Sequence, residues 1–281
     1  MALGVPFFPF ISEISPLIRN FHNSSAPPRP ASLFPPNLPM EGNKPMTCSL
    51  RKLILLGGTS AAAFLFGFVS QLRSAETPRF DHTVRNAFFA GFGGNKEALQ
   101  QGMKACEDAL AENPNHAEAL VWHGGGLFFL SNTFFKAGDY QKGTEYFNKG
   151  MGEMDRAVEL APDRIAVRVP RGATLLTATR FLGQHPRREE LLKKGLEDYS
   201  RVYELQKTRM DTLSEHSKGE LLFGLAEGWS RAGDSVKART YFEQIASDLR
   251  GTAYAERANV WFEKGSIPLA QTGCVGCHVN K

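Results

Sequence analysis

Cysteine and histidine gather at one place in the sequence, the run Cys274-Val275-Gly276-Cys277-His278. Two thiols three positions apart can form a redox pair, share a metal ion, or each add to one vinyl group of the same porphyrin. In the last case the histidine that follows is placed to ligate the iron from one face. A zinc site would need further ligands, and the sequence has no second cluster of cysteine and histidine. A thioredoxin-type pair would lie near a βαβ pattern, which we do not find. A chance occurrence is the remaining alternative.

This CxxCH spacing resembles the haem-attachment motif of c-type cytochromes. The resemblance implies one covalently attached haem c, with Cys274 and Cys277 forming the thioethers and His278 ligating the iron. Only three residues follow His278, so a second iron ligand would have to come from upstream. His123 is the first candidate for this distal ligand, and a five-coordinate iron is equally allowed. Lower-ranked candidates are Met151, Met154, His116, His185 and His216.

The first 76 residues have the composition of a leader. Residues 1–45 hold ten of the sixteen prolines and are predicted to be disordered. Translation that started at Met40 or Met46 would leave most of them out. The segment 46–76 places Arg51-Lys52 before an uncharged apolar run, 53–70, which is typical of a signal peptide or a membrane anchor. We therefore expect the remainder to be extracytoplasmic, periplasmic or anchored facing the periplasm, with an organelle lumen as the alternative.

Charge is balanced once the leader is set aside. The full sequence carries 33 Lys and Arg against 29 Asp and Glu. Six of the basic and two of the acidic residues lie before residue 76, which leaves 27 of each sign in the rest of the chain. No excess of positive charge therefore points to nucleic acid or to an anionic membrane surface as a partner.

The segment between residues 77 and 264 is predicted to be entirely α-helical. Apolar residues recur at three and four spacing, the breaks contain glycine, proline or asparagine, and no strand-like alternation persists. The fold class expected is therefore all-α, followed by a short tail over 265–281. The helices expected cover 80–91, 95–112, 116–136, 139–160, 164–182, 187–208, 213–232, 235–248 and 252–263.

The helical pattern resembles the tetratricopeptide repeat family, most clearly over 219–252. The apolar and small residues of the repeat are there Leu222, Leu225, Ala226, Trp229, Ala238 and Phe242. The segment departs from the family at Ile245 and Arg250, and the resemblance covers most of 80–252. A terminal proline that comes fourteen residues late predicts a longer hairpin between residues 120 and 162. The resemblance implies stacked antiparallel hairpins, a right-handed superhelix, and a surface that docks protein partners.

Three features of the helical body bear on function, and two of them have both a structural and a functional interpretation. The run Gly124-Gly125-Gly126 indicates either close packing of a neighbouring helix or a smooth wall for a flat ligand beside His123. Cys106 is predicted to be a buried free thiol. A basic set indicates either a solvated face balanced by Glu189, Glu190 and Glu197, or a patch for haem propionates or an acidic redox partner. Its members are Arg164, Arg168, Arg171, Arg187, Arg188, Lys193 and Lys194.

The sequence as a whole favours an exported helical-repeat protein that carries one haem c and acts in electron transfer or redox-partner docking within a larger assembly. The alternative is an extracytoplasmic scaffold for protein–protein contacts in which CxxCH is incidental. We identify no catalytic constellation, because there is no phosphate loop and no Ser/His/Asp arrangement with a local signature. A haem enzyme would also need a distal acid–base group that the sequence does not reveal.

Overall fold

The structure is a computed structural model, and it describes residues 79–272. In this part of the chain every regular element is a helix. The α-helices are α1 (Phe80–Phe92), α2 (Lys96–Glu112), α3 (Ala117–Lys136), α4 (Tyr140–Leu160), α5 (Ile165–Ala178), α6 (Arg188–Gln206), α7 (Glu215–Arg231), α8 (Ser235–Asp248) and α9 (Ala253–Lys264). Two short 3-10 helices, η3 (Lys207–Thr212) and η4 (Leu269–Gln271), complete the described part. The prediction of an all-α fold is therefore confirmed.

Helix boundaries follow local signals in the sequence. The side chains of Asn95, Asp139 and Asp234 each accept a hydrogen bond from a backbone N–H in the first turn of the helix they precede. Gly138 and Gly233 adopt the left-handed conformation that reverses the chain, with φ of 80° and 83°. Because these signals are local, the expected helix ends agree with the observed ones to within about two residues, with one exception.

The exception is α5, which ends at Ala178 although the sequence predicts a helix up to residue 182. The carbonyl oxygen of Leu176 accepts a hydrogen bond from the Thr179 hydroxyl at 3.0 Å and another from Nη2 of Arg231 at 2.9 Å. Side chains thus donate hydrogen bonds to a carbonyl oxygen that, in a longer helix, would accept one from a backbone N–H. One of these side chains comes from α7, so the early end of α5 depends on the tertiary fold.

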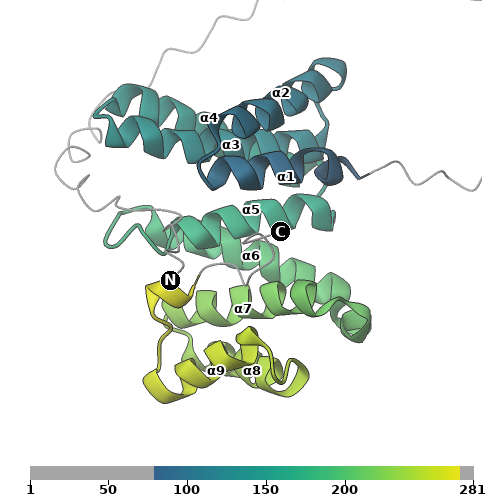
Figure 1. Ribbon diagram of the computed structural model, residues 1–281, viewed down its shortest axis with the longest axis vertical. Coiled ribbons are helices and arrows are strands. Elements are labelled where there is room, and N and C mark those ends of the chain that lie inside the picture. The colour runs from purple at the N-terminus through teal and green to yellow at the C-terminus, as the bar shows by residue number, and fades with distance from the viewer. Residues whose placement is uncertain (1–78, 273–281) are drawn as a thin grey trace, which may run out of the picture. The chain divides into compact units, whose positions relative to one another are not determined.

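The helices pack in neighbouring pairs (Figure 1), α1 with α2, α3 with α4, α5 with α6 and α7 with α8. The first helix of each later pair also contacts the second helix of the pair before it, and α9 packs on α8 in the same way. Contacts between α1 and α3, α3 and α5, and α5 and α7 continue the series. This pattern, in which each unit touches its neighbours, is how helical repeats bury their apolar faces.

The buried positions agree with the repeat spacing over 219–252. Leu222, Leu225, Ala226, Ala238 and Phe242 are all fully buried. Phe242 also stacks on the indole of Trp261 in α9, with ring centroids 4.7 Å apart. The apolar core therefore continues from α7 through α8 to α9. Membership of the repeat family and the right-handed superhelix that it implies stay predictions.

The α3–α4 pair shows why glycine occurs inside helices here. A Cβ atom on Gly124 would lie 2.7 Å from the carbonyl oxygen of Gly150, and one on Gly150 would lie 2.6 Å from that of Gly124. A Cβ on Gly126 would collide with Met103, whereas one on Gly125 would meet only the Thr174 hydroxyl at 3.6 Å. Close packing therefore accounts for two of the three consecutive glycines. Helices α3 and α4, with 20 and 21 residues, also confirm the prediction of a longer hairpin.

Candidate functional site

The predicted haem-attachment residues Cys274, Cys277 and His278 lie outside the described residues, as do the leader segments 1–45 and 46–76 with the apolar run 53–70. The described chain ends at Thr272, only two residues before the motif begins. No helix between residues 79 and 272 is long and apolar enough to cross a membrane. The same residues contain no group of three or more potential metal ligands. The haem site and the membrane anchor therefore stay predictions.

His123 lies in the middle of α3 with 5% of its surface exposed. Its Nδ1 is 2.6 Å from Oε2 of Glu153 on α4, and its Nε2 is 3.7 Å from Oε1 of Glu107 on α2. Carboxylates on two neighbouring helices thus face both ring nitrogens, which fixes the orientation of the imidazole. To serve as a distal iron ligand, His123 would have to exchange one of these carboxylates for the metal.

Cys106 is a free, fully buried thiol on α2, as expected. Burial raises its pKa to about 12, and the neighbouring carboxylates of Glu153 and Glu107 act in the same direction. The thiol therefore stays protonated through the physiological range and is not a nucleophile.

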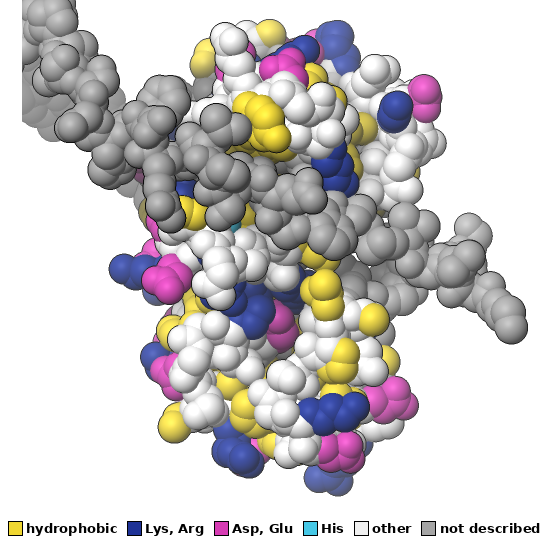
Figure 2. All heavy atoms as spheres, turned by 90° about the vertical axis from the view of Figure 1, so that its left-hand side faces the viewer, with side chains coloured by type: hydrophobic (Ala, Val, Ile, Leu, Met, Phe, Trp, Pro, Cys, Tyr) yellow, Lys and Arg dark blue, Asp and Glu magenta, His cyan; other side chains and the backbone are white. Residues whose placement is uncertain are grey.

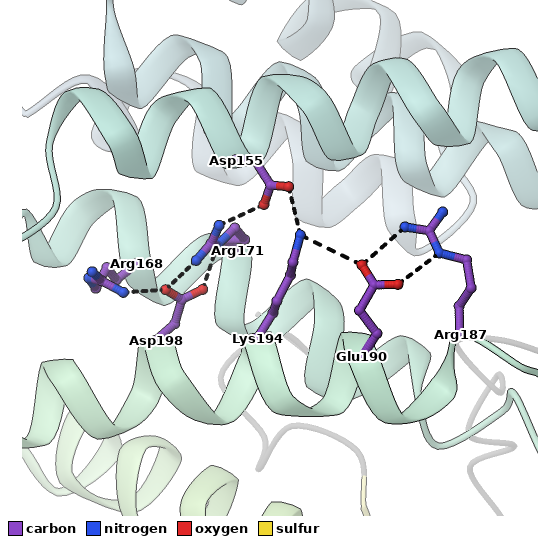
Figure 3. A network of polar contacts seen from close by, with 7 residues as sticks. All are labelled: Asp155, Arg168, Arg171, Arg187, Glu190, Lys194 and Asp198. Atoms are coloured by element: carbon purple, nitrogen blue, oxygen red, sulfur yellow. Dashed lines mark hydrogen bonds and ion pairs between the residues drawn. The ribbon is translucent and has the colours of Figure 1, made fainter. Parts of the chain in front are cut away.

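Several of the basic residues singled out in the sequence form ion pairs between helices, among them Arg168, Arg171 and Lys194 (Figure 3). Arg171 on α5 donates through Nε and Nη2 to Asp198 on α6, at 2.7 and 2.9 Å, and through Nη1 to Asp155 on α4 at 2.7 Å. Arg168 donates to the same Asp198 at 2.7 Å. Lys194 then connects Asp155, at 2.7 Å, with Glu190. We call this set, together with Arg187, which pairs with Glu190, the α4–α6 network.

The expectation of a solvated basic face holds for Lys193, which pairs with Glu197 at the surface, and for Arg187, but the α4–α6 network corrects it for Arg168 and Arg171. The Asp198 side chain is fully buried and that of Arg171 is 8% exposed, so neither belongs to a hydrated surface. The expected balancing residue Glu190 does take part, but Asp155 and Asp198 are the main partners. The charges of Arg168, Arg171 and Lys194, which the sequence leaves available for a ligand, thus pair with carboxylates inside the fold. Arg164 also forms an ion pair with a buried carboxylate, that of Glu118 on α3.

A second group of buried charges lies where α5 and α7 end. Oε2 of Glu227 accepts hydrogen bonds from Nε and Nη2 of Arg180, both at 3.2 Å, and its Oε1 is 2.6 Å from Nε of Arg231. The remaining nitrogens of Arg231 donate to the hydroxyl of Thr179 and the carbonyl of Leu176. Burial lowers the pKa of Arg231, and the nearby Arg180 and Arg188 lower it further against the opposing effect of Glu227.

These charged residues line a half-open cavity of about 310 Å³, and the start of the tail forms part of its wall. Gly265 adopts a left-handed conformation, with φ of 68°, and ends α9, so that the chain turns back toward α7. Ile267, Leu269 and Thr272 of the tail then lie in the wall of the cavity together with Arg180 and Arg231. Thr272 itself is buried and donates its hydroxyl to the carbonyl of Leu269 at 2.7 Å. We call this space the tail cavity.

Comparison with protein-family models, with curated proteins and with solved structures gave no match to this chain. The described part of the surface shown in Figure 2 has no feature that indicates a particular kind of ligand or partner. On the face shown in Figure 2, basic and acidic side chains of the described residues are intermixed with apolar ones, without a large area of one sign. The CxxCH motif and the tail cavity are therefore the two features of the chain that bear on its function.

Proposed function

We propose that this protein is an exported helical-repeat protein that carries one covalent haem c on its carboxyl-terminal tail and acts in electron transfer or redox-partner docking within a larger assembly. The observation that carries the proposal is the spacing of Cys274, Cys277 and His278. Two thiols and an adjacent imidazole are the donor set that covalent haem attachment and proximal ligation require. When bound, haem supplies a one-electron carrier whose potential depends on its ligands and on nearby charge.

The helical body supports this proposal because the described start of the tail, up to Thr272, packs against it. In an extended chain, two residues span at most about 7 Å, so Cys274 lies within that distance of Thr272. Thr272 is buried against the ends of α5 and α7. The residues that would hold the haem thus follow directly from a segment that packs on the body. The body itself would supply the surfaces that bind a protein partner, as helical repeat stacks do.

A haem stain after denaturing electrophoresis tests the proposal, with protein produced in cells that have a haem-attachment system. We expect a coloured band for the full chain and none after deletion of residues 273–281. The deleted protein should keep its helical circular dichroism and its cooperative melting, because the helices and their core lie before residue 273. A colourless full-length protein would favour the alternative, a scaffold for protein contacts in which CxxCH has no haem.

Export has its own test. If the segment 46–76 is a cleaved signal, sequencing of the purified protein should find its amino terminus between about residues 70 and 77. If it is an uncleaved anchor, the protein should sediment with membranes and keep Arg51-Lys52. A chain that begins at Met1 and is recovered from the cytosol would contradict both the export and the haem proposals.

A further inference from the structure

The tail cavity holds more buried positive charge than negative charge. Arg180 and Arg231 share one carboxylate, that of Glu227. The side chains of the three residues are only 11%, 16% and 6% exposed. The other acceptors around Arg231 are a hydroxyl and a carbonyl, which carry no formal charge. Two guanidinium groups and one carboxylate leave one unit of positive charge on side chains that are mostly removed from water, and an anion nearby would offset its cost.

The α4–α6 network also has one more basic than acidic group, four against three, so the two sites differ in their free hydrogen-bond donors and not in their charge balance. There, carboxylates of Asp198 and Asp155 receive all three donor groups of Arg171 (Figure 3). In the tail cavity, Arg180 donates to Glu227 through Nε and Nη2, and no described residue accepts a hydrogen bond from its Nη1. One edge of the Arg180 guanidinium thus keeps a donor for a ligand. Arginine presents such donors in a planar fork that matches a carboxylate.

The size and lining of the cavity restrict what that ligand can be. Its volume of about 310 Å³ is that of about ten water molecules, and lies at the low end for small-molecule sites. Ile267 and Leu269 give one part of the wall an apolar surface, while the two arginines give the other part positive charge. A carboxylate on a short apolar stem fits this combination, whereas a whole porphyrin ring does not.

We propose that Arg180 and Arg231 form a carboxylate-binding subsite, and that its occupant is a propionate group of the haem attached at Cys274 and Cys277. The second half of this inference rests on the proposed function, because it requires the haem. The tail brings the attachment site close, since the Cys274 Cα lies within about 7 Å of that of Thr272 in the cavity wall. A soluble carboxylate is the other source of the same chemistry, and the experiment separates the two.

The first arm uses the full-length haem-loaded protein and measures its midpoint potential at neutral pH. A positive charge beside a propionate disfavours the oxidised iron, which has one more unit of positive charge. Arg180→Gln should therefore shift the potential downward, while Arg180→Lys, which keeps the charge, should shift it much less. Arg156→Gln is the matched control, because Arg156 is an exposed residue of α4 that pairs with Glu159. Equal potentials in all four proteins would overturn the haem propionate as the occupant.

The second arm uses full-length haem-free protein and the free propionate ion as the probe, with chloride at equal ionic strength as the reference. Propionate should raise the melting temperature of the wild type by mass action, and this rise should be lost in Arg180→Gln and kept in Arg156→Gln. If propionate raises the melting temperature but Arg180→Gln leaves the haem potential unchanged, the subsite binds a soluble carboxylate and not the haem. If haem never attaches, the melting temperatures still show whether Arg180 and Arg231 bind a carboxylate. Failure of the haem proposal can therefore be told apart from failure of the subsite proposal. If propionate does not raise the melting temperature and Arg180→Gln does not shift the haem potential, there is no carboxylate-binding subsite here.

Discussion

The carboxylate of Asp198 receives the guanidinium of Arg171 through two hydrogen bonds, Nε to Oδ2 at 2.7 Å and Nη2 to Oδ1 at 2.9 Å. The two side chains face each other as parallel forks, the arrangement in which arginine binds a carboxylate most strongly. Because Arg171 also donates to Asp155, one residue of α5 connects α4 with α6. The junction between two helical pairs thus depends on a buried ion pair as well as on apolar contact.

Replacement of Asp198 by asparagine is expected to destabilise the body by about 3–5 kcal/mol, because it leaves Arg171 and Arg168 buried with too little negative charge. Denaturant unfolding measures this free energy. The control is Asp163→Asn, whose partner Arg201 lies at the surface and whose loss should change the stability little. If Asp198→Asn unfolds at the same denaturant concentration as the wild type, the network does not hold the helices together.

The consecutive glycines of α3 offer a matched pair of substitutions with opposite signs. Gly124→Ala should destabilise the protein by about 1–3 kcal/mol, because the new Cβ would lie 2.7 Å from the carbonyl oxygen of Gly150. Gly125→Ala should stabilise it by up to about 1 kcal/mol, since alanine favours the helix and its methyl meets only Thr174 at an ordinary distance. Thermal melting of both variants checks this. Equal effects on the two melting temperatures would mean that α3 and α4 do not pack as described.

The raised pKa of Cys106 predicts that the protein loses stability at alkaline pH. Its pKa of about 12 in the folded protein exceeds the ordinary value of 9.0, so between these values the folded state binds more protons than the unfolded state. Stability due to this thiol is therefore complete below pH 9 and falls by about 1.4 kcal/mol per pH unit above it. Unfolding free energies of the wild type and of Cys106→Ala, measured at pH 8 and pH 10, should converge as the pH rises. A constant difference would show that the thiol ionises freely.

Much of the fold can be predicted from the sequence, because its determinants are local. Helix starts depend on caps such as Asn95 and Asp234, and reversals depend on glycines such as Gly138. The repeat spacing over 219–252 also identifies core positions such as Ala226 correctly. The early end of α5 is missed because Arg231, 55 positions from Leu176, provides part of the reason for it.

The charged sites could not be predicted in the same way. Arg171 was recognisable as one of a basic series, but its partner Asp198 is 27 positions away, and only the packing of α5 on α6 brings them together. In the tail cavity the sequence does hold one signal, because Glu227 and Arg231 are four positions apart on one helix. The third member, Arg180, is 47 positions from Glu227, so the shared carboxylate becomes visible only in the folded chain.

Mass spectrometry of one peptide tests most directly whether Cys274 and Cys277 carry a haem. Trypsin cleaves after Lys264 and so releases residues 265–281, which contain both cysteines and His278. We predict that this peptide, from protein made with a haem-attachment system, has the mass of the chain plus one haem and absorbs visible light. The Cys274→Ser, Cys277→Ser double variant should yield the peptide without that added mass. Recovery of the wild-type peptide with two unmodified cysteines would contradict the account.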